Sequence, residues 1–339
     1  MATVYKTFLN DDVISRRTLL HEAIPITGSL VSGAYNETNI KTFSHGRFES
    51  VYDYNWQSSS ANHIFDITVG YSPKSGLSAS SNTTEQSQKI QMYNQMAQIL
   101  VGHDTTGSVL EFDKDGDLAA GGEKLQECVF LSFSRLLVKD EIKKGSIQFQ
   151  IGTGSYSTPF DGTLKTIGDY GAATSYKINS PAGEYGILYT SSVDTDSAVG
   201  LVFYQAGIMV LTASVFGGGA TYSSTEGLNA VLTGSSIQDN CDLIRRRFQD
   251  LDFNNTVELN STIYFCRINH NEFNYSSNPT YLSSSQIRVK DSSLDSPVSY
   301  ITTVGLYSST NELLAVAKLS EPLKKTPENE MILRVRLDY

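Results

Sequence analysis

Hydrophobic and polar residues alternate along most of the chain with the two-residue period of β-strands whose faces have different surroundings. The segment HIFDITVGY, residues 63–71, is typical: Phe65, Ile67 and Val69 fall on one side and the residues between them on the other. Similar runs bounded by turn residues predict further strands. They lie at 49–57, 128–138, 146–152, 261–270, 285–290, 298–307, 312–319 and 331–339.

Two segments instead show the spacing of a helix. Near 84–101, apolar residues recur every three or four positions from Ile90 to Leu100, after Thr83, which fits an N-cap. A second helix is predicted in SIQDNCDLIRRRFQDL, with Ser236 as its cap. Its apolar face comprises Ile237, Cys241, Ile244 and Phe248.

These elements predict a mainly β, α+β fold, built of antiparallel β-sandwich-like domains with about two helices. We expect three consecutive regions. Residues 1–125 form an N-terminal α+β region containing the first helix, residues 126–235 a central β domain, and residues 236–339 a helix followed by a C-terminal β domain.

One apolar segment, VGLVFYQAGIMVLTASVF at 199–216, has nearly the length of a membrane-spanning helix. Its centre, Gln205-Ala206-Gly207, is typical of a tight turn between two β-rich runs. We therefore expect a buried β-hairpin in this segment and no membrane span.

The chain has few charged residues. They make up 18% of it, against roughly 25% in an average globular protein, and the net charge is −10. Its 19 tyrosines suit protein–protein contacts, because Tyr supplies both contact area and a hydrogen bond, but a chain rich in strands is also rich in Tyr. The acidic balance argues against nucleic acid as the main partner, since phosphate binding needs a basic face.

The three cysteines, Cys128, Cys241 and Cys266, are far apart and form no CxxC pair. Such a sparse, odd set is typical of reduced thiols in a protein made in the cytosol. The N-terminal residues include no apolar stretch of signal-peptide length, so we expect no secretory route.

The motif DKDGD at 113–117 raises the question of calcium binding. Its three aspartates match the first, third and fifth positions of an EF-hand loop. The sixth position is Leu118 instead of Gly, and the twelfth is Lys124 instead of Glu. The EF-hand pattern therefore fails, and we expect a polar turn.

The sequence contains no motif of a known catalytic class. It has no GxSxG, no HExxH and no glycine loop of a phosphate-binding kind, and its five histidines are scattered. Cys266 and His270 lie four residues apart in a predicted strand and its following loop, a separation of roughly 13 Å. We expect no enzymatic activity, no catalytic residues, no cofactor and no metal site.

The segment ITTVGLYSSTNELLAVAKLSEPL, residues 301–323, consists of two apolar runs around the polar turn 308–311. These runs predict a β-hairpin buried on both faces. Such a hairpin needs cover from the rest of its domain or from a neighbouring chain.

Four motifs follow one another in this part of the chain: NEFNYSSNP (271–279), TVGLY (303–307), NELLAVAKL (311–319) and MILRVRL (331–337). With them, residues 265–339 resemble the C-terminal segments of virion structural proteins of contractile-tailed bacteriophages. RLLVKDEIKKGSIQFQIG and GLVFYQAGIMVL are similar to further elements of these proteins.

This resemblance implies a building block of the tail, baseplate or neck, located in the virion after assembly in the host cytoplasm. Its expected partners are other virion proteins and copies of itself, in a homo-oligomer within a larger assembly. Polar-aromatic character beside turns identifies the expected interface residues. These are Tyr275, Asn278, Pro279, Tyr281 and Tyr307. Two other roles stay open: a capsid decoration or head-completion protein, and a carbohydrate-binding tail module.

Overall fold

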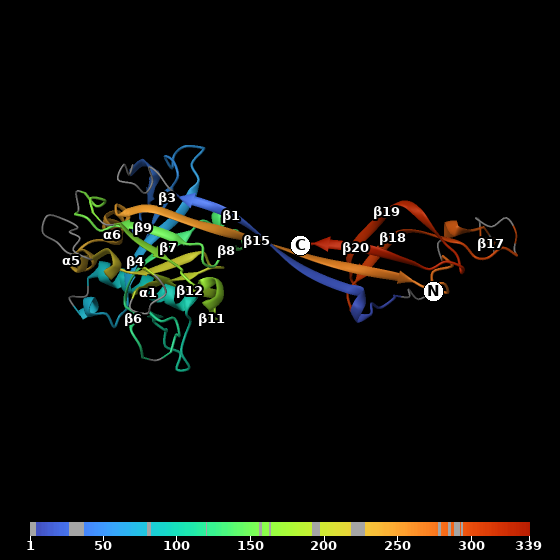
Figure 1. Cartoon of the computed structure of the whole chain (residues 1–339), viewed down its shortest axis with the longest axis horizontal. Coiled ribbons are helices and arrows are strands. Elements are labelled where there is room, and N and C mark those ends of the chain that lie inside the picture. Colours follow the sequence, from blue (N-terminus) through green and yellow to red (C-terminus); the bar gives the residue numbers. More distant parts are fainter. Residues whose placement is uncertain are drawn as a thin grey trace. The chain divides into compact units, whose positions relative to one another are not determined.

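The computed structural model forms two compact units (Figure 1). Unit 1 consists of residues 1–19 and 258–339, and unit 2 of residues 20–257. Both boundaries fall within long strands, β1 (Val13–Ile26) and β15 (Phe248–Ile268), so each of these strands contributes to both units. The structure describes residues 5–26, 37–79, 83–119, 121–155, 158–162, 164–191, 197–217, 228–276, 279–283, 286–287, 292 and 294–339.

Unit 2 contains most of the secondary structure. Its further strands are β2 (Ile40–Thr42), β3 (Glu49–Tyr52), β4 (His63–Tyr71), β5 (Phe112–Asp113), β6 (Lys124–Leu125), β7 (Glu127–Phe133), β8 (Glu141–Ile142), β9 (Gln148–Gly152), β10 (Leu164–Gly168), β11 (Lys177–Ser180), β12 (Gly183–Tyr189), β13 (Ala198–Phe203) and β14 (Ile208–Thr212). Its helices are α1 (Thr84–Leu100), α2 (Arg135–Val138), α3 (Ala172–Ser175), α4 (Ser214–Gly217), α5 (Leu228–Gly234) and α6 (Ile237–Arg245), with short 3₁₀ turns at Glu37–Asn39 and Gly76–Ala79.

The main sheet of unit 2 has the strand order β1-β15-β9-β10-β12-β13-β14-β7-β4-β3-β2. Near its middle, Leu131 of β7 lies opposite Ile67 of β4 on one side and Met209 of β14 on the other, both in antiparallel register. The predicted mainly β fold with antiparallel sheets is thereby confirmed.

Strand β7 is buried on both faces, because its side chains alternate between two apolar clusters. Val129 and Leu131 belong to a cluster that includes the buried face of α6, whereas Cys128 and Phe130 belong to one that includes the buried face of α1. The helices therefore cover both faces of this sheet, whereas a sheet with one face in water needs cover on the other face only.

Both predicted helices are present. The Thr83 side chain accepts a hydrogen bond from the Gln86 amide at 3.3 Å and begins α1, and Ser236 caps α6 through the Asp239 amide. The placement of Phe248 on the second helix is wrong. That helix ends at Arg245, and Phe248 already pairs with β9 as the first residue of β15.

The predicted strand at 128–138 is too long. The chain leaves β7 after Phe133 and forms the short helix α2, in which Leu136 is exposed. The hairpin predicted at 199–216 is confirmed: Phe203 pairs with Ile208 across the turn, so β13 and β14 are neighbours. Among the residues that the structure describes, no helix combines the length and the apolar character needed to cross a membrane.

Unit 1 contains the second half of β15, the hairpin of β18 (Ser299–Tyr307) and β19 (Leu313–Lys325), and β20 (Met331–Asp338). Short elements complete it: η1 (Asn10–Asp12), η5 (Pro279–Tyr281), β16 (Leu282–Ser283) and β17 (Gln286–Ile287). β20 pairs with β15, whereas β18 and β19 pair with each other. In the described part of this unit, only Ile268, Leu306 and Val335 are buried hydrophobic residues.

The two units divide the chain differently from the three expected regions. The boundary expected at residue 125 falls between strands of one sheet, because β4 pairs directly with β7. The boundary expected at 235 falls between α5 and α6, which contribute to the same apolar cluster. Pairing between strands that are distant in the sequence cannot be recognised from the local composition, on which the expected boundaries were based.

Lys89 joins two helices inside unit 2. It lies on α1, its side chain is fully buried, and its ammonium donates to the carbonyls of Leu232 (2.6 Å) and Ser235 (2.5 Å) at the end of α5. These acceptors are C-terminal carbonyls that a helix leaves unpaired. Burial lowers the pKa of Lys89 to about 8, against an ordinary lysine value of 10.5.

We predict that rising pH stabilises the folded protein through Lys89. Between pH 8 and 10.5 the unfolded chain binds more protons at this group than the folded protein does, so stability rises with pH. From pH 7 to 9.5, the unfolding free energy of the wild type should gain about 2 kcal/mol relative to Lys89→Met. Urea titrations at both pH values measure this gain, and a Lys74→Met variant, changed at an exposed lysine, serves as the control. A pH-independent difference between wild type and Lys89→Met would contradict the prediction.

Gly70→Ala should destabilise unit 2. Gly70 lies on β4 where α1 crosses it, and a Cβ there would meet the Lys89 carbonyl oxygen at 2.7 Å and the Tyr93 amide nitrogen at 2.8 Å. The new methyl group would force α1 away from β4, because both contacts are with backbone atoms that cannot rotate aside. We expect the free energy of unfolding to fall by about 1–3 kcal/mol. Gly76→Ala is the matched control, since a Cβ at Gly76 meets nothing within 4 Å. Equal unfolding midpoints for the two variants would contradict this packing.

Candidate functional site

The expected interface residues that the structure describes all belong to unit 1. The Tyr307 ring packs against Tyr5 with centroids 4.8 Å apart, and the Tyr275 ring contacts Tyr281 edge-on at 5.8 Å. Burial raises the pKa of Tyr281. Asn278 lies outside the described residues, as does the side chain of Pro279, whose backbone begins η5.

The hairpin β18–β19 carries an apolar patch that remains exposed. Leu314 and Val316 are 68% and 51% exposed, and Tyr307 pairs with Leu313 beside the turn that closes the hairpin. A Cβ at Gly305 would meet both the Tyr307 ring and the Leu313 side chain, so these side chains lie over the glycine. We call Tyr307, Leu313, Leu314 and Val316 the hairpin patch.

The prediction that this hairpin is buried on both faces is wrong for the isolated chain. Leu306 is buried, at 6% exposure, but the hairpin patch is not covered. No further strand pairs with β18 or β19 among the described residues, so their outer edges are unpaired as well. Exposed apolar residues on strands with free edges are features of surfaces that bind other chains.

A cavity of about 700 Å³ adjoins β18 within unit 1. It is bounded by the N-terminal segment, by β15 and by the loop before η5, and its wall is rich in aromatic residues. These are Tyr5, Phe8, Phe265, Phe273, Tyr275, Tyr300 and Tyr307. Tyr275 and Tyr307, far apart in the sequence, thus line one space. Asp12 at its margin is bound by Arg267, which lowers the pKa of the carboxyl.

Polar contacts hold the loop beside this cavity. Lys325 is fully buried at the end of β19, and its ammonium donates to the His270 carbonyl (3.0 Å), the Asn274 side chain (2.7 Å) and the Thr326 carbonyl (2.7 Å). The Ser299 hydroxyl donates to the Phe273 carbonyl. Hydrogen bonds therefore hold the parts of unit 1 together, whereas unit 2 is held together by an apolar core.

Cys266 and His270 form no dyad. The His270 ring lies 3.1 Å from the Glu330 carboxylate, on the segment leading to β20. Burial raises the pKa of Cys266, and it raises those of the fully buried thiols of Cys128 and Cys241 further. A raised pKa keeps a thiol protonated and unreactive. The sequence-based placement of Cys241 in the core is confirmed.

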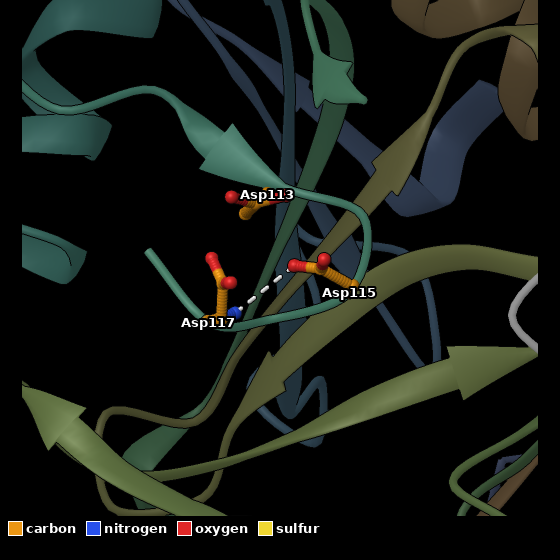
Figure 2. Close-up of side chains that lie close together, drawn as sticks. All are labelled: Asp113, Asp115 and Asp117. Carbon is orange, nitrogen blue, oxygen red and sulfur yellow. Dashed lines mark hydrogen bonds between the residues drawn. The ribbon is translucent and has the colours of Figure 1, made fainter. Parts of the chain in front are cut away.

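A second candidate site lies in unit 2, in the turn between β5 and β6 (Figure 2). The carboxylates of Asp113, Asp115 and Asp117 each place an oxygen within 4.8 Å of the others. The Asp117 amide donates to Asp115 at 3.2 Å, and the Ala119 amide donates to Asp117 at 2.7 Å. No other group of this size that could hold a metal ion occurs among the described residues.

Asp113 differs from the other two aspartates because it is fully buried. Lys124 donates to its Oδ2 and, at 2.6 Å, to the Ala119 carbonyl, whereas its Oδ1 is buried without a hydrogen-bond donor. Desolvation raises the pKa of Asp113 against the opposing effect of Lys124. Sequence reasoning identified this turn but not the burial of its first residue.

Comparisons with protein-family models, with curated proteins and with solved structures found no match to this chain.

Proposed function

We propose that the chain is a structural subunit of a contractile-tailed phage virion, in the tail, baseplate or neck, and that it acts by assembling with copies of itself through unit 1. The exposed hairpin patch carries this proposal. The resemblance of residues 265–339 to phage virion proteins supports it, since these residues form most of unit 1.

Unit 1 has hydrophobic side chains but little intramolecular burial for them. Its exposed apolar residues include Tyr5, Phe8, Leu9, Ile14, Tyr300, Tyr307, Leu313, Leu314, Val316, Leu323 and Ile332. Full burial of one such side chain stabilises by about 1.5–3 kcal/mol. A standard interface needs about 800 Å² from each partner, an area that several of these residues together can supply.

A second copy fits this surface better than a charged partner. Two chains of net charge −10 repel each other in general, so self-association requires a contact region without like charges. The hairpin patch has no charged member, and the charged residues nearest to it along the chain are one acid, Glu312, and one base, Lys318. Tyr307, a member of the patch, and Tyr5, whose ring packs against it, suit such a contact, since tyrosines pack and donate hydrogen bonds.

The double variant Leu314→Lys/Val316→Lys should disrupt self-assembly. Each lysine would place a charge in the contact between copies, and we expect the apparent dissociation constant of the full-length protein to rise at least about 100-fold. Sedimentation velocity over a wide concentration range measures it. Ile178→Lys is the control, because Ile178 is also exposed, at 74%, on β11 of unit 2. A wild type that stays monomeric at every concentration, or a double variant that assembles normally, would overturn the proposal.

The position in the particle is tested separately by cryo-electron microscopy of the phage that encodes the chain. Density of this subunit arranged around the tail axis supports the proposal. Density on the capsid surface or at the head opening would replace it with the capsid decoration or head-completion role.

The aromatic cavity favours a second candidate function, a carbohydrate-binding tail module. Tyr5, Tyr275 and Tyr307 line it, and aromatic faces are common in sugar sites. Its carboxylate Asp12 is only 4% exposed and is already paired with Arg267. If this function holds, host surface glycans should bind the full-length protein, and Tyr275→Ala should weaken binding at least about tenfold. If calorimetry detects no binding of host surface glycans to the wild type, the carbohydrate-binding function is excluded.

A further inference from the structure

The turn that joins β5 to β6 concentrates negative charge on its inner side. Figure 2 shows Asp115 and Asp117 pointing into the space that the turn encloses, with Asp113 across from them. One lysine, Lys124, offsets part of this charge, and the Glu123 carboxylate is bound by Lys114 at 2.9 Å. Three carboxylates so close together repel each other unless a cation or a proton lies between them.

The burial of Asp113 is the second observation, and it is independent of the clustering. Its Oδ1 is shielded from solvent and accepts no hydrogen bond from any described donor, although a buried carboxylate oxygen normally has a partner. Because Lys124 binds Oδ2, Oδ1 remains available to bind a ligand. A bound cation beside Asp113, Asp115 and Asp117 would give this buried oxygen a partner and offset the charge that Lys124 leaves uncompensated.

The dimensions fit a large, hard cation. Ligand oxygens at 2.3–2.6 Å from a calcium ion can lie roughly 5 Å apart on opposite sides of it, and these three oxygens lie within 4.8 Å of one another. All three are carboxylate oxygens, which calcium prefers, and neither His nor Cys takes part. Asp115 and Asp117 are exposed, so an ion can enter from solvent and keep water ligands.

The same turn is attached to the sheet by its backbone. The Tyr185 hydroxyl on β12 donates to the Gly116 carbonyl at 2.8 Å, and Asn179 on β11 donates to the Asp117 carbonyl at 2.9 Å. Gly116 has a φ of +67°, and a Cβ there would meet Ile187 at 3.1 Å. A ligand that fixes the carboxylates therefore also fixes the contact of this turn with β11 and β12.

The geometry points to a calcium site formed by Asp113, Asp115 and Asp117, which holds the β5–β6 turn against β11 and β12. The site differs from an EF-hand, since its first carboxylate is a buried residue at the end of a strand and its twelfth position is Lys124. Its role is structural, and it is independent of the assembly surface in unit 1.

Full-length protein, freed of metal with a chelator, is titrated with calcium chloride and, separately, with terbium(III). Terbium emission is excited through tyrosine, and Tyr185 lies beside the site through its bond to Gly116. We expect calcium to raise the unfolding temperature and to displace terbium. Asp115→Asn should weaken both effects at least about tenfold, because removing a ligand charge lowers calcium affinity.

Two further variants separate this site from general binding to an acidic chain. Asp104→Asn changes an aspartate in another exposed turn and should leave both titrations unchanged. Lys124→Met removes the competing ammonium, so calcium should raise its unfolding temperature by more than it raises that of the wild type. No calcium effect on the wild type, or an effect that survives Asp115→Asn, would overturn the proposal.

Discussion

Two-sided burial of the central strands is the constraint on which unit 2 depends. Because successive residues of β7 point to opposite faces, Leu131 and Phe130 can both be buried only if each face of the sheet has its own cover. Helices α1 and α6 provide part of it. The close approach at Gly70 and the buried ammonium of Lys89 follow from this arrangement, since they join α1 to β4 and to α5.

Unit 1 is built on a different balance of forces. Lys325 and Ser299 hold its loop and hairpin through hydrogen bonds, and each such bond adds only about 0.5–1.5 kcal/mol of net stability. Its apolar residues, such as Leu314, meet water instead of each other. A partner chain would give this unit the apolar burial that unit 2 obtains within one chain. Covering these exposed side chains would therefore stabilise unit 1 itself.

Local sequence patterns predict individual helices and strands, but they do not predict which distant strands pair. Alternation located β4 and β18, and capping residues located α1 and α6, because these signals act within a few residues. The extent of unit 1 could not be predicted, since it is set by pairing of β15 with β20 and by an N-terminal segment more than 200 residues away. The exposure of Leu314 could not be predicted either, because an apolar strand covered by its own domain has the same sequence pattern as one that its domain leaves exposed. In the acidic turn the pattern identified three aspartates, but only the fold shows that Asp113 is buried.

Strand β15 has a consequence for how the sequence can vary. It is 21 residues long, its first half pairs with β9 and its second half with β20. Within one strand, a single inserted or deleted residue turns every later side chain to the opposite face. Buried Asn255 and Ile268 thus share one register, although they serve different units. Length changes should accumulate in the loops of this chain and be excluded from β15, even where its side chains are exposed and free to be substituted.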